Sequence, residues 1–396
     1  MCLEPAWREL FGSGVRAAAA VSSLDDKVSF TTYIGSKDHA ALDIAATTFN
    51  FSLHATEIQQ TVAFEYYHCL STPIIDPVIP LIPKADGLVV EDENILRFGF
   101  LEGDAIVHGE NVIYDPQNAY NPKPFRENGS TAKRLAVVAN SDECLKLTNA
   151  TCEWYESESL GKALLEQEEA EVVVVKRGSL GATIVTSGET RHIPAYRTSR
   201  VWSIGSGDVF AAIFAFFWAS EKMDPFTAAS RASLATAYYC DTKRLPIPAN
   251  FIEKANYHPI ERKNDFPLSP KQVYLAGPFF TMAERWMINQ ARTHLYEEGF
   301  QVFSPLHNVG YGTAAEVAPA DIEGLNNSVI VFALLDGLDA GTIFEVGYAR
   351  SLNKPVVVFV QNESEDDLKM LSGTNCEIVY DFVSAIYRVT WAAMQI

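Results

Sequence analysis

A stretch near the C-terminal end of the chain holds carboxylates and glycines at spacings that could serve chemistry. Asp339 and Glu345 lie six residues apart, with Gly341 between them, and Asp321 precedes the apolar run that leads into the stretch. Glycine lets the backbone approach a ligand closely. A carboxylate can act as a nucleophile, and a second one can hold a proton for a leaving group. The stretch is therefore a candidate site for acid–base or covalent chemistry.

A second stretch, SIGSGDVFAAIFAFFWA (203–219), could hold an anion. Gly205, Ser206 and Gly207 lead into an apolar helix, and Asp208 lies at its start. A glycine turn before a helix presents backbone N–H groups to an anion. The segment VKRGSLGATIV (175–185), which contains Gly178, comes shortly before it.

Each acidic residue also has a structural interpretation. Asp339 could be an N-cap or turn residue, Asp321 a helix cap, and Asp208 the cap of a tight turn. Glu345 could be a first-turn acid that complements the helix dipole, and the helix N-terminus would then favour its ionised form.

The elements that must position these residues form two α/β units. Up to residue 243, apolar β-branched runs alternate with helical stretches, which predicts a largely parallel sheet. The strands expected there are 28–33, 111–114, 135–138, 171–175 and 182–186, and the helices are 142–147, 208–219 and 225–240.

The region 244–270 contains five prolines and mixed charges, so we expect a linker between domains 1–243 and 271–396. In the second domain, strands are expected at 272–276, 301–304, 328–334 and 355–360, and helices at 281–298 and 343–352. The acidic residues fall at strand-to-loop junctions, where an open parallel sheet builds its site.

The composition limits the partners. The formal net charge is −19 over 396 residues, which argues against a nucleic acid polymer as partner. Six cysteines form no CxxC pair, and the longest apolar run, 209–219, is too short to span a bilayer. With no signal-peptide pattern at the N-terminus, we expect a cytoplasmic protein with reduced thiols and no membrane association.

The C-terminal motifs resemble the nucleoside 2-deoxyribosyltransferase family. They are VYLAGPFF (273–280) and ADIEGLNNSVIVFALLDGLDAGTIFEVGYARSLNKPVVVF (320–359). The resemblance implies a flavodoxin-like parallel-sheet domain that needs no cofactor. It makes Glu345 the nucleophile, Tyr274 the residue that orients it, and Asp339 and Asp321 the carboxylates that hold the base, the sugar or a proton. Gly277 and Gly341 would contact the substrate.

The same resemblance implies small-molecule nucleosides or nucleotides as substrates and a homo-oligomer, since these enzymes complete their sites across a subunit contact. The completing Asn has no clear counterpart, and Asn375 is a candidate. Sugar transfer and hydrolysis of nucleoside 5′-monophosphates, which occurs in relatives, both stay open.

The N-terminal motifs resemble the ribokinase-like (PfkB) family. The resemblance implies a ribokinase-like domain in which Asp208 is the base that takes the proton from the substrate hydroxyl. Gly178, Gly205, Ser206 and Gly207 would bind the phosphates of ATP. Asn140 and Glu143, in ANSDE, would be tied to Mg²⁺.

This chain departs from the family pattern at three positions. Trp202 and Ser203 replace the usual Asp and Thr of the signature, and Arg16 stands where an Asn often contacts the substrate. Three hypotheses follow. The domain is a kinase that acts in sequence with the second domain, or it is a silent binding module, or it is the only enzyme and the second domain is a nucleotide sensor.

Overall fold

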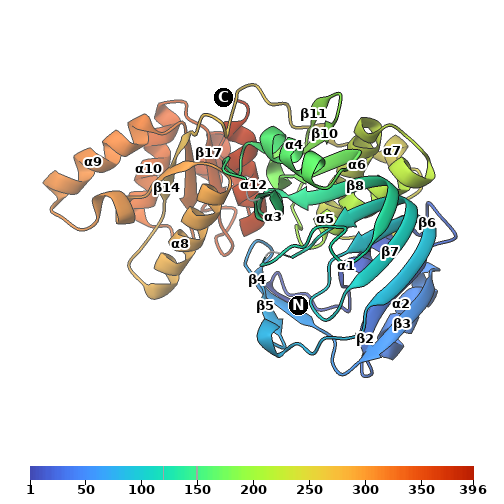
Figure 1. Ribbon diagram of the computed structural model, residues 1–396. Helices are drawn as coiled ribbons and strands as arrows, with labels where there is room; N and C mark the ends of the chain where they lie inside the picture. The colour runs from blue at the N-terminus through green and yellow to red at the C-terminus, as the bar shows by residue number, and fades with distance from the viewer. Residues whose placement is uncertain (119, 149) are drawn as a thin grey trace. The chain divides into compact units, whose positions relative to one another are not determined.

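The computed structural model describes residues 1–118, 120–148 and 150–396 and divides into two compact units (Figure 1). The N-terminal unit comprises Met1–Thr198 and Trp202–Pro259, and the C-terminal unit comprises Ser199–Val201 and Ile260–Ile396. The short segment Ser199–Val201 joins the second unit through the backbone N–H of Val201, which donates to Ser384 Oγ at 2.7 Å. The units divide between Pro259 and Ile260, within the region 244–270 that was predicted to be a linker. The domain limits 1–243 and 271–396 stay a prediction.

A six-stranded sheet forms the centre of the N-terminal unit. Strands β6 to β9 are mutually parallel, and β10 and β11 are added antiparallel at one edge. Runs of valine such as that of β9 suit a strand buried on both faces. In the order of the sheet, the strands are β11 (Thr190–Ile193), β10 (Ala182–Thr186), β9 (Val172–Lys176), β8 (Thr131–Asn140), β7 (Ala105–Asp115) and β6 (Leu88–Phe98).

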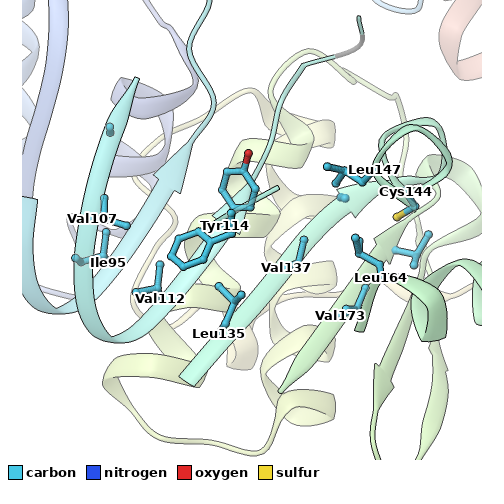
Figure 2. Packing of buried hydrophobic residues seen from close by; sticks show 14 of the residues in the cluster. Ile95, Val107, Val112, Tyr114, Leu135, Val137, Cys144, Leu147, Leu164 and Val173 are labelled. Carbon is cyan, nitrogen blue, oxygen red and sulfur yellow. The ribbon is translucent and has the colours of Figure 1, made fainter. Parts of the chain in front are cut away.

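Side chains of β6 to β9 pack with the helices α3 and α4 into one core (Figure 2). Val112, Leu135 and Val173 alternate with residues on the opposite face, as the period of a strand requires. Tyr114 is fully buried in this core and donates its hydroxyl to the carbonyl of Lys123.

Smaller sheets and the helices complete the unit. The remaining strands are β1 (Cys2–Glu4), β2 (Ser29–Gly35), β3 (Ser52–Ile58), β4 (Ala63–His68), β5 (Ile74–Asp76), β12 (Tyr196–Arg197) and β13 (His258–Pro259). The α-helices are α1 (Ser13–Val21), α2 (His39–Phe49), α3 (Ser141–Thr148), α4 (Ser157–Gln167), α5 (Ser206–Ala215), α6 (Pro225–Thr242) and α7 (Phe251–Lys254). The expected helix 208–219 therefore begins two residues earlier and ends as a π-helical turn, Phe216–Ser220.

The C-terminal unit is built on five parallel strands in the order β15-β14-β16-β17-β18. They are β14 (Gln272–Ala276), β15 (Gln301–Phe303), β16 (Ile330–Leu334), β17 (Val356–Phe359) and β18 (Glu377–Val379). Numbered along the unit, this is the order 2-1-3-4-5 of the flavodoxin-like fold. The strand order reverses between β14 and β16, so the carboxyl ends of these two strands mark the expected ligand crevice.

The helices of this unit are α8 (Met282–Glu297), α9 (Ala314–Asn327), α10 (Ala340–Ser351), α11 (Lys369–Gly373) and α12 (Phe382–Ala393). A capping box between Thr281 and Glu284 fixes the start of α8. Helix α10 begins at Ala340, three residues before the predicted start, because Asp339 caps it. In the described part of the chain, no helix is long and apolar enough to cross a membrane.

Candidate functional site

Tyr274 and Glu345 meet at the switch point of the C-terminal sheet. Tyr274 is the central residue of β14, where it pairs with Val331 of β16, and its fully buried ring stacks on Phe303. Its hydroxyl donates a hydrogen bond to Glu345 Oε1 at 2.5 Å. Burial and the neighbouring charge of Glu345 raise the pKa of Tyr274, so its hydroxyl keeps the proton that it donates. The tyrosine therefore fixes the orientation of one carboxylate oxygen.

The protonation of Glu345 differs from the prediction. We expected the helix N-terminus to favour its ionised form, but its pKa is raised to about 7, chiefly by burial. Glu345 is the sixth residue of α10, and the helix dipole acts mainly within the first turn. The hydrogen bond from Tyr274 lowers the pKa, whereas the charges of Asp321 and Asp339 raise it.

The two other carboxylates of the predicted site are close enough to act on Glu345 but have different surroundings. Asp339 is the N-cap of α10, where its Oδ2 accepts hydrogen bonds from the Thr342 N–H at 2.8 Å and the Thr342 hydroxyl at 3.0 Å. Asp321 lies on α9, its Oδ1 is buried without a hydrogen-bond partner, and burial raises its pKa. Burial thus favours the protonated form of Asp321.

The predicted substrate glycines support this site through packing. A Cβ at Gly277 would lie 3.0 Å from Ile288 Cδ1 and 3.1 Å from Leu334 Cβ, so the turn after β14 packs closely on its neighbours. A Cβ at Gly341 would lie 3.1 Å from Asp339 Oδ2, beside the cap. Asn375, with φ +61°, lies in the turn before β18.

The N-terminal unit contains a cavity of about 1960 Å³ that several predicted residues line. These are Asn140, Glu143, Gly205 and Asp208, together with Arg16. Gly178 lies outside the residues that line the cavity, in the tight turn between β9 and β10. The backbone N–H of Ser206 donates to the Ser203 carbonyl, so it is not available to an anion.

Asp208 is surrounded by hydrogen-bond donors from distant parts of the chain. Its Oδ2 accepts from Arg16 Nη1 of α1, and its Oδ1 accepts from the Gln117 side chain. The Arg16 and Asp208 side chains are 5% and 8% exposed. Asp208 is therefore half of a buried ion pair.

The residues predicted to be tied to magnesium, Asn140 and Glu143, each accept a hydrogen bond from the other's backbone N–H. Asn140 Oδ1 accepts from the Glu143 N–H, and Glu143 Oε2 accepts from the Asn140 N–H, both at 2.9 Å. The pair thus closes the first turn of α3. Nearby, buried Asp115 pairs with Lys176 Nζ at 2.5 Å. In the described residues, no group of three His, Cys, Asp or Glu side chains is placed to hold a metal.

Gln117 and Lys176 are residues of this site to which the sequence analysis assigned no role. Gln117 has φ +42° and its side chain also accepts from Ser13 Oγ. Lys176 Nζ lies 3.4 Å from where a Cβ of Gly207 would be, so it borders the glycine turn. The only sequence signal was the position of Lys176 within the run 175–185.

Comparisons with known proteins match the two units to different families. Residues 108–243 match the model of the pfkB family of carbohydrate kinases, and residues 273–376 match that of the nucleoside 2-deoxyribosyltransferases. A 5-dehydro-2-deoxygluconokinase of Listeria monocytogenes serovar 1/2a is 27% identical over 126 residues, which cover 30% of this chain and 39% of that protein. The match thus spans about two fifths of the length of that curated relative.

Similar solved structures include two ribokinases and a 2-deoxyribosyltransferase. A ribokinase from Thermotoga maritima is 19% identical, with 62% of this chain and 86% of that chain covered and a TM-score of 0.43. A ribokinase of Arabidopsis thaliana, solved with ribose and ATP, is 17% identical, with 62% and 86% covered and a TM-score of 0.44. A 2-deoxyribosyltransferase from Bacillus psychrosaccharolyticus is 27% identical, with 28% and 88% covered and a TM-score of 0.25. By the family models, residues 108–243 are similar to the pfkB carbohydrate kinases, and residues 273–376 are similar to the nucleoside 2-deoxyribosyltransferases.

Proposed function

We propose that the C-terminal unit cleaves or exchanges the N-glycosidic bond of a nucleoside through a covalent intermediate on Glu345. The observation that carries the proposal is the hydrogen bond from Tyr274 to Glu345 at the switch point of the sheet. It holds one oxygen of a carboxylate in a fixed orientation, as a nucleophile requires. The match of residues 273–376 to the nucleoside 2-deoxyribosyltransferases supports the same chemistry.

The reaction would proceed in two displacements at the anomeric carbon of the sugar. Ionised Glu345 attacks this carbon, the C–N bond breaks, and its electron pair passes to the base nitrogen, which takes a proton from Asp321. A water molecule or a second base then attacks the same carbon, Glu345 leaves as a carboxylate, and the incoming group returns a proton to Asp321. Two inversions give overall retention at this carbon.

The charges around Glu345 favour an uncharged nucleoside over a 5′-monophosphate. The side chains whose charges act on its pKa are Asp321 and Asp339, and neither is a cation that could pair with a phosphate. A phosphate bound here would also lie close to ionised Glu345, and like charges at close range are destabilising. Nucleosides are therefore the first substrates to test.

For the N-terminal unit we propose the binding of a small molecule in its cavity. The size of the cavity and the match of residues 108–243 to the carbohydrate kinases support a sugar, a nucleoside or ATP as the ligand. Transfer of phosphate with Asp208 as base, and a purely nucleotide-sensing C-terminal unit, are the alternatives.

A product assay tests the glycosidic proposal. The full chain is incubated with a panel of nucleosides and nucleoside 5′-monophosphates, with a second base as acceptor, with and without MgATP. Liquid chromatography should show free base or exchanged nucleoside, faster from nucleosides than from monophosphates. If no substrate releases its base under any of these conditions, the glycosidic proposal is wrong.

A further inference from the structure

Each oxygen of the Asp208 carboxylate already accepts a hydrogen bond from the protein. Arg16 Nη1 donates to Oδ2, and the Gln117 side-chain amide donates to Oδ1. A general base must direct an oxygen at the substrate hydroxyl at hydrogen-bond distance. Both oxygens of Asp208 are instead directed at donors of the protein itself.

Arg16 is built into this position. Its side chain is 5% exposed, and its Nη2 donates to the Phe11 carbonyl at 3.0 Å. The guanidinium lies directly against Gly205, where any Cβ would overlap it. Gly205 has φ +78° and belongs to the turn that the sequence suggested as a phosphate site. The arginine thus fills the space over this turn with a fixed positive charge.

Gln117 is held equally firmly on the other side of Asp208. Its backbone is left-handed, and its side-chain oxygen accepts from Ser13 Oγ while its amide donates to Asp208. A non-glycine residue keeps such a conformation only when its surroundings fix it. The hydrogen bonds to Ser13 and Asp208 are contacts that do so.

The two residues before the glycine turn are also used in packing. Trp202 is buried, meets Trp7 edge to face at 5.3 Å between ring centroids, and has Lys243 Nζ 3.6 Å from its own ring centroid. Ser203 Oγ donates to the Cys69 carbonyl at 2.9 Å. These contacts belong to the interior of the unit.

We infer that Asp208 is the structural counter-ion of Arg16, and that the N-terminal unit binds its small-molecule ligand without transferring phosphate. The inference is independent of the glycosidic chemistry of the C-terminal unit. The two possible roles of Asp208 predict opposite effects of removing its carboxylate. If Asp208 is a counter-ion, its removal leaves Arg16 buried and unpaired and lowers the stability. If Asp208 is a reactive carboxylate, its removal often raises the stability.

The first test is a double-mutant cycle on the full chain, followed by calorimetry. Arg16→Met and Asp208→Asn should each lower the Tm of the N-terminal unit by roughly 6–20 °C, because each breaks a buried pair. The double variant should recover most of this loss, since neither charge is then left alone. Leu135→Ala identifies the thermal transition of the N-terminal unit, because Leu135 lies in the core of that unit and its truncation should lower the same Tm.

A matched cycle on an exposed pair of the same unit is the control. Lys133 and Glu110 lie 3.5 Å apart with side chains 74% and 50% exposed. Lys133→Met and Glu110→Gln should shift the Tm by less than about 4 °C and show little coupling. If Arg16→Met does not fold, Arg16→Lys serves instead, because lysine keeps the charge but lacks the planar fork of donors.

The second test measures transfer of the γ-phosphate of MgATP to ribose, fructose, myo-inositol and a set of nucleosides. The parent and Asp208→Asn should give the same background rate. Transfer by the parent that Asp208→Asn lowers about a hundredfold or more would overturn the inference. An unchanged or higher Tm in Asp208→Asn would also overturn it.

Discussion

Each unit buries one carboxylate that accepts hydrogen bonds from the protein, but the partners of the two carboxylates differ in charge. Glu345 receives a neutral donor, the Tyr274 hydroxyl, and its charged neighbours Asp321 and Asp339 are both acidic. Asp208 receives a guanidinium on one oxygen and an amide on the other. Glu345 thus has a neutral donor beside it, whereas one oxygen of Asp208 is paired with the positive charge of Arg16.

The comparison also shows that recognising a motif is not sufficient to infer its activity. Both carboxylates lie in segments that match enzyme families. What differs is the set of partners brought in by the fold, and one of these, Arg16, is 192 residues away along the chain. Three substitutions in the C-terminal unit test the contrast on the side where we expect chemistry.

The largest expected effect is that of Glu345→Ala. If the reaction passes through a covalent ester on Glu345, this variant should lose roughly three or more orders of magnitude in turnover, because the covalent route disappears. Release of base from the preferred nucleoside, measured by chromatography, checks the rate. A 2-fluoro nucleoside should leave a sugar adduct on Glu345 in the parent, which peptide mass spectrometry can locate.

Glu323→Ala is the control for Glu345→Ala, because Glu323 is an exposed acid on α9. It should keep the turnover of the parent. Near-parental activity of Glu345→Ala, or an adduct on Asp339 or Asp321, would contradict the assignment of the nucleophile.

Tyr274→Phe should have an intermediate effect and a distinct pH signature. The hydrogen bond to the ionised carboxylate is lost while the ring stacked on Phe303 remains, so turnover should fall about ten- to a hundredfold. In the parent, turnover should be lost as the pH falls through about 7, because Glu345 must be ionised to attack. Removing the hydroxyl removes a contact that lowers the pKa of Glu345, so this acidic limb should move to higher pH.

The pH profile of kcat, measured for both proteins, distinguishes this role from a purely structural one. A variant that is only less well folded would lose activity at every pH without moving the limb. An unshifted limb in Tyr274→Phe would therefore show that the tyrosine does not tune Glu345.

The smallest effect concerns the stability contributed by Asp339. Asp339→Ala removes the cap of α10 and should cost about 1 kcal/mol, or roughly 4 °C in the Tm of the C-terminal unit. Asp339→Asn keeps an oxygen for the Thr342 N–H and should restore most of the Tm. Calorimetry of the two variants measures the cap, and a role of the charge would appear as turnover lost in Asp339→Asn although its Tm is restored.

The sequence was informative about the sheets and about the spacing of the acidic residues. Strands such as β14 and β10 were predicted to the residue, because apolar runs bounded by turns have one obvious conformation. Helix boundaries were less accurate. The helix that holds Glu345 was expected to begin at residue 343, whereas Asp339, named from the sequence as a possible N-cap, caps it at Ala340.

The state of each carboxylate could not be predicted, because it depends on contacts distant along the chain. The pKa of Glu345 follows from its burial and from Tyr274 and Asp321, which lie on other elements, so no local pattern reveals it. The pairing of Asp208 with Arg16 required α1 and α5 to lie side by side. The left-handed backbone of Gln117 is likewise imposed by its partners.

The segment Ser199–Val201 bears on how such a fusion can evolve. It lies between elements of the N-terminal unit, yet its backbone satisfies the buried Ser384 hydroxyl and accepts from Arg388 of the C-terminal unit. A recombination event between codons 243 and 271 would replace the C-terminal unit but leave these three residues behind. The incoming unit would therefore meet three residues whose backbone now hydrogen-bonds to Ser384 and Arg388.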